Sequence, residues 1–76
     1  MSSGTLNWAR EKVYELSDKC QRLSCRAECR EQNLRDYIGR EELNLIRMEL
    51  EDAMDILRHE DPKMYEKALA LEELIL

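Results

Sequence analysis

Three cysteines are the residues whose chemistry could most readily define a site. Cys20, Cys25 and Cys29 fall in one helical stretch, and the last two, four residues apart, share a face on which they could supply two zinc ligands. A tetrahedral zinc site needs four ligands, and the single histidine, His59, belongs to another predicted helix, so only a symmetric dimer could complete the set. We therefore predict no metal and no cofactor. The cysteines are expected to be buried as small apolar residues, with a reactive exposed thiol as the alternative.

A stripe of basic residues is the second candidate site. Lys19, Arg22, Arg26 and Arg30 recur every three or four residues and follow one side of a helix, which could track the phosphates of double-stranded RNA. Against this, the chain carries a net charge of −5, and acidic residues of the following helix could neutralise the stripe. The acidic partners expected for it are Glu49, Glu51, Asp52 and Asp55. Nucleic-acid binding is therefore the alternative function rather than the first prediction.

Residues for catalysis are sparse. The chain has one histidine, no glycine-rich phosphate loop and no HExxH motif. The run His59-Glu60-Asp61 combines a base with acids, but it falls at a predicted helix end, where a histidine interacts favourably with the helix dipole. We predict that the protein is not an enzyme and has no catalytic residues.

Helices must position all of these residues. The 76 residues include two glycines and one proline, and 38% are charged, a composition typical of long helices. Apolar residues at alternating spacings of three and four predict one continuous helix from about residue 5 to residue 38, interrupted only by Arg30 at a core position. Its heptad seam consists of Leu6, Ala9, Val13, Leu16, Cys20, Leu23, Ala27, Leu34 and Tyr37.

Two breaks divide the rest of the chain. Gly39 ends the first helix, and the second, over residues 40–60, is out of register with the first seam, so the chain must bend, kink or reverse there. Asp61 followed by Pro62 predicts the start of a third helix over residues 62–75. The second helix presents one packing face, formed by Leu43, Ile46, Leu50, Met54 and Leu57. The apolar end of the chain, which includes Leu76, suggests a fragment of a longer protein.

These features predict an all-α fold, either a helical bundle or a coiled-coil dimer. A single domain of this size rarely stabilises itself without a disulfide, a metal or a partner, so we predict an oligomerisation domain spanning residues 1–76. Its first partner would be a second copy bound through the heptad seam, and another protein helix is the second candidate. Trp8 and Tyr14 lie off the seam and could either contact a partner surface or shield the ends of a bundle. The chain has no apolar run long enough for a membrane span and no signal peptide, so an intracellular protein is expected.

Overall fold

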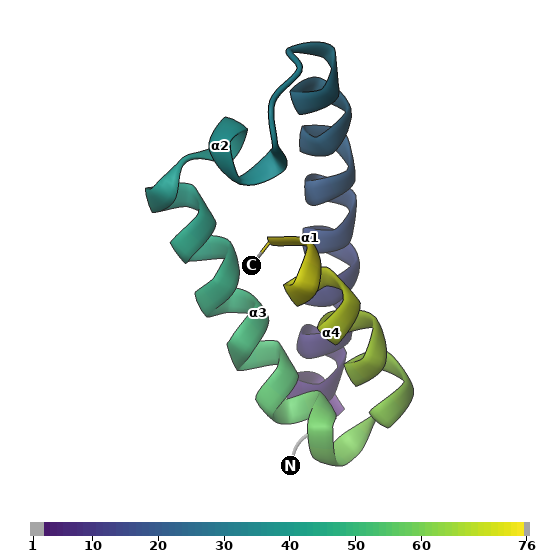
Figure 1. The fold of residues 1–76 in the computed structure, drawn as a ribbon. Coiled ribbons are helices and arrows are strands. Elements are labelled where there is room, and N and C mark those ends of the chain that lie inside the picture. Colours follow the sequence, from purple (N-terminus) through teal and green to yellow (C-terminus); the bar gives the residue numbers. More distant parts are fainter. Residues whose placement is uncertain (1–2, 76) are drawn as a thin grey trace.

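Three long helices and one short helix form the part of the chain that the structure describes. The structure is a computed structural model that describes residues 3–75, and its helices are α1 (Ser3–Cys29), α2 (Leu34–Ile38), α3 (Arg40–Glu60) and α4 (Pro62–Ile75). α1 and α3 run in opposite directions, and α4 turns back from the end of α3 to pack against both (Figure 1). Residues 3–75 contain no strand, which confirms the all-α prediction.

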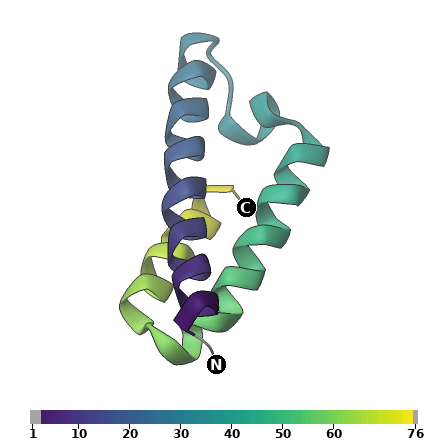
Figure 2. The same ribbon diagram turned by 180° about the vertical axis from the view of Figure 1, so that it is seen from behind.

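The prediction of a single helix over residues 5–38 is wrong, because the helix breaks after Cys29. The amide of Glu31 donates to the carbonyl of Glu28 at 3.0 Å, and the amide of Gln32 donates to the carbonyl of Ala27 at 2.9 Å. This pair of hydrogen bonds is the Schellman motif, which satisfies carbonyls at the end of a helix. The chain then turns into α2, which spans the wide end between α1 and α3 (Figure 2).

Tertiary packing, not local sequence, explains this break. Glu31 has a φ of 56°, in the left-handed region that the Schellman motif normally fills with glycine. A side chain with a Cβ pays about 1–2 kcal/mol to adopt it. Residues 30–33 contain neither glycine nor proline, so their own preference is to continue the helix. This break, together with the one at Gly39, lets the backbone reverse so that α3 packs against the apolar face of α1.

The other two predicted breaks are confirmed. Gly39 has a φ of 89° and a ψ of 162°, a combination essentially restricted to glycine, and the direction of α3 shows that the chain reverses between α1 and α3 (Figure 1). Asp61 caps α4, because the amide of Met64 donates to its Oδ1 at 3.3 Å, and Pro62 takes the first helical position.

One apolar core lies between α1, α3 and α4. Its position follows from the sequence pattern, because each of the three helices turns its apolar stripe toward the other two. The buried members are Ala9, Val13, Leu16 and Cys20 from α1, Ile46, Leu50, Ala53, Met54 and Leu57 from α3, and Met64, Ala68, Leu71 and Ile75 from α4. Leu76 lies outside the described residues. Among residues 3–75, no helix is both long and apolar enough to cross a membrane.

Candidate functional site

The heptad seam is covered within a single chain. Ala9, Val13, Leu16 and Cys20 are at most 3% exposed and pack in the same core as the apolar faces of α3 and α4. Ala27 is also buried, beside the break between α1 and α2. The remaining seam residues are half-buried: Leu6, Leu23, Leu34 and Tyr37. For a second chain to bind at this seam, α1 must therefore first separate from α3 and α4, which cover the seam in this structure.

The predicted face of α3 covers the seam from one side. Ile46, Leu50 and Leu57 are at most 2% exposed, Met54 is buried, and Leu43 is half-buried against the same core. These side chains come from successive turns of α3 and share one core with the apolar face of α1. Any rearrangement of α1 must replace this contact in full.

Ion pairs between helices flank the covered seam. Lys12 Nζ lies 3.4 Å from Glu49 Oε2, and Lys19 Nζ lies 3.0 Å from Glu42 Oε1, so two lysines of α1 are each paired with a glutamate of α3. All four side chains are partly exposed, so each pair contributes about 0–1 kcal/mol. Because each pair joins α1 to α3, a chemical cross-link between its two side chains would identify which α3 packs against a given α1.

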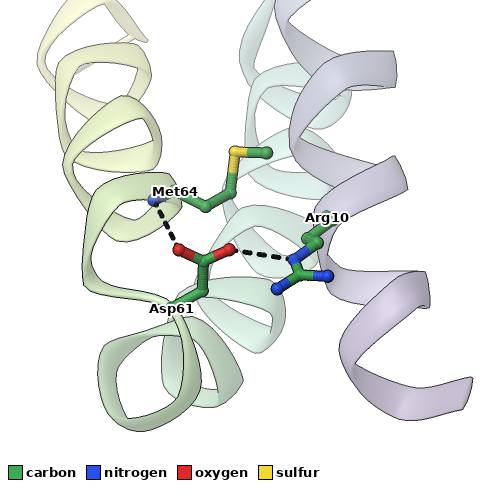
Figure 3. A network of polar contacts seen from close by, with 3 residues as sticks. All are labelled: Arg10, Asp61 and Met64. Carbon is green, nitrogen blue, oxygen red and sulfur yellow. Dashed lines mark hydrogen bonds and ion pairs between the residues drawn. The ribbon is translucent and has the colours of Figure 1, made fainter. Parts of the chain in front are cut away.

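Asp61 joins α1 to the start of α4 (Figure 3). Arg10 Nε donates to Asp61 Oδ2 at 2.9 Å, while Asp61 Oδ1 accepts from the amide of Met64. The hydrogen bond from Arg10, assisted by the amide of Met64, lowers the pKa of Asp61 below the ordinary value for a carboxyl. Asp61 therefore serves two structural purposes, and the neighbouring His59 and Glu60 are simply exposed at the end of α3.

The basic stripe is partly neutralised. Lys19 is paired with Glu42, Arg22 Nη2 lies 3.0 Å from Asp18 Oδ2, and the Arg30 guanidinium lies 5.9 Å from the centre of the Tyr37 ring. Arg26 is exposed. None of these four cations contacts an acidic residue predicted for it: Glu49 pairs with Lys12, while Glu51, Asp52 and Asp55 line a shallow groove beside Arg58. The paired charges leave fewer cations for phosphates than the sequence suggests.

The prediction that the cysteines are buried is wrong for two of the three. Cys20 is fully buried, and burial raises the pKa of its thiol. Cys25 and Cys29 are free and exposed on the side of α1 away from the core. Both α3 and α4 pack on the seam side of α1, so nothing in residues 3–75 covers the opposite face. Within that range, no group of three or more histidine, cysteine or acidic side chains is placed to hold a metal ion.

The two aromatic residues of α1 lie at its surface. Trp8 is 41% exposed with Lys12 Nζ 5.9 Å from its ring centre, and Tyr14 is 57% exposed with Lys67 Nζ 5.3 Å from its ring centre. Tyr14 borders a shallow apolar groove between α1 and α4. The other residues that line this groove are Val13, Ser17, Lys67, Ala70, Leu71 and Leu74.

The left-handed conformation of Glu31 is the feature of this region that the sequence does not reveal. Residues 30–32 contain neither glycine nor proline to signal this turn, and the nearest residue typical of turns is Asn33, the N-cap of α2. Comparison of the chain with models of protein families, with curated proteins and with solved structures found no match.

Proposed function

We propose that the protein is a self-association module that forms a homodimer by exchanging α1 between two copies. In the exchanged dimer, the heptad seam of each α1 packs on α3 and α4 of the other copy, and residues 30–33 become helical and join α1 to α2. The single observation that carries this proposal is the left-handed Glu31 in a segment whose sequence favours helix. A strained hinge without glycine is a recognised route to domain exchange.

The energetic balance favours a dimer of moderate affinity. The packing of α1 is the same in both forms, so the difference comes from the hinge and from the loss of translational freedom. Relief of the left-handed residue stabilises the exchanged form by about 1–2 kcal/mol per chain, or about 2–4 kcal/mol per dimer. The short connection between α1 and α3 gives intrachain packing an effective concentration of about 1 mM, which would be the dissociation constant of an exchanged dimer without strain relief. Relief of the strain lowers that dissociation constant to about 1–30 µM.

A cross-linking experiment with isotope-labelled protein tests the exchange. Light and ¹⁵N-labelled chains are mixed in denaturant, refolded and separated into monomer and dimer, and a carbodiimide then joins lysines to adjacent carboxylates. The informative bonds are Lys12–Glu49 and Lys19–Glu42, which connect α1 to α3. In the dimer we expect about half of the cross-linked peptides to join a light to a heavy chain, and in the monomer none.

Two results would contradict the proposal. A dimer whose Lys12–Glu49 bonds all join peptides of the same isotope would associate through a surface and not through α1. The proposal is also contradicted if the chain stays monomeric in sedimentation equilibrium up to about 1 mM. That concentration is more than an order of magnitude above the expected dissociation constant. The cross-link between Lys12 and Glu15, neighbours on α1 at 3.4 Å, is the internal control, because it joins peptides of one isotope in either form.

A further inference from the structure

We propose that Cys25 and Cys29 form a two-coordinate site for Cu(I). Both thiols are free and exposed, and they lie one turn apart on the side of α1 that no described helix covers. Cysteine is among the residue types most often buried, so two exposed thiols on one helical face are unusual. The site is independent of the exchange of α1, because both ligands belong to the same helix in either form.

Distances favour a bridging ion over a disulfide. Residues four apart on a helix have Cβ atoms about 5–6 Å apart, whereas a disulfide needs about 3.8 Å and so requires the helix to distort. A metal bonded to both sulfurs at about 2.3 Å, and in line with them, holds them about 4.6 Å apart, which side-chain rotation can reach from this backbone. The pair is therefore better suited to share an ion than to bond directly.

Coordination number selects the ion. Zinc requires four ligands, and no third histidine, cysteine or acidic side chain in the described part of the chain is placed to complete such a set. Soft thiolates select Cu(I), which is stable with two sulfur ligands in a line. Binding converts two thiols and one Cu⁺ into a complex of charge −1 and releases two protons, with no change in oxidation state.

Two arginines lie beside the complex, and the exposed Glu28 lies on the other side of Cys25 around the helix. Arg22 lies one turn before Cys25, and Arg26 lies one turn before Cys29, so each sulfur has a guanidinium within reach along the helix surface. Arg26 is exposed, while Arg22 shares its charge with Asp18. An anionic copper complex is stabilised by these cations, whereas a cation bound by neutral donors would be repelled.

An anaerobic titration of the reduced full chain tests the site. Cu(I) is added in the presence of bicinchoninate, which absorbs light when it holds copper, and the expected result is one Cu(I) withheld per chain. Cys25→Ser and Cys29→Ser should each weaken binding at least tenfold, while Cys20→Ala should retain it because that thiol is buried. Loss of binding in folded Cys20→Ala, or equal affinity in all three variants, would overturn the assignment.

Two variants with relocated thiols separate geometry from thiol content. Cys29→Ser with Gln21→Cys restores a pair four residues apart, and binding should return. Cys29→Ser with Ser17→Cys keeps two exposed thiols and both arginines but places the sulfurs eight residues apart, about 12 Å along the helix axis, and binding should stay weak. Tight binding by this second variant would refute the geometric argument, as would a copper-dependent dimer in sedimentation, since that would place one ion between two chains.

Discussion

In the exchange that we propose, replacement of Glu31 by glycine should convert the dimer into a monomer. Glycine adopts the left-handed and right-handed conformations about equally well, so the closed form loses its strain while the exchanged form gains nothing. The closed form is thereby favoured by about 1–2 kcal/mol per chain, which is about 2–4 kcal/mol per dimer. At 1.4 kcal/mol per tenfold change, the dimer dissociation constant should rise by about 30- to 700-fold.

Glu31→Gln is the matched control for this experiment. Glutamine removes the charge but keeps the Cβ and a similar helix preference, so its dissociation constant should stay within a few-fold of the wild type. Sedimentation equilibrium of the three proteins over the micromolar to millimolar range measures the effect, with circular dichroism as a check that each variant is folded. Equal shifts for glycine and glutamine would mean that the charge of Glu31 matters, and no shift for glycine would show that hinge strain does not control association.

Three further outcomes follow from the packing and the charges. Leu50→Ala, at a fully buried position, should lower the free energy of unfolding in urea by about 2–5 kcal/mol, and a loss below 1 kcal/mol would contradict its place in the core. Asp61→Asn keeps the helix cap but loses the bond to Arg10, so its melting temperature should fall below wild type at pH 7. Because the folded pKa of Asp61 is lowered, this stabilisation is lost as pH falls through that value, and the two proteins should melt alike in strong acid. Wild type should not bind an RNA duplex at physiological salt, and salt-sensitive binding abolished by Arg22→Glu with Arg26→Glu would instead support the basic stripe as a phosphate-binding surface.

Local signals were sufficient for most of the secondary structure. The boundary at Gly39 and the start of α4 at Asp61-Pro62 could be predicted, because a positive φ and a capped helix start depend on the residues at those positions. The apolar periodicity of α3 likewise anticipates which of its side chains are buried. Both signals act over a few residues and so survive in any tertiary arrangement.

The cysteines show where the prediction failed. The periodicity places Cys25 and Cys29 opposite the seam, but whether a helix covers that side depends on how many helices pack and from where. In the structure both α3 and α4 approach from the seam side, which leaves the two thiols exposed. The candidate copper site is therefore visible only after the fold is known.

The sequence by itself determined that this chain is helical, where its glycine and proline interrupt it, and which face of each helix is apolar. Only the tertiary structure decided that α1 ends at Cys29 and that its seam is covered by the same chain. The physical reason is that apolar burial is not directional: a heptad seam gains the same free energy against its own α3 as against that of a second copy. What the local sequence does not show is the left-handed backbone at Glu31, which ends α1 and lets the same chain cover its own seam.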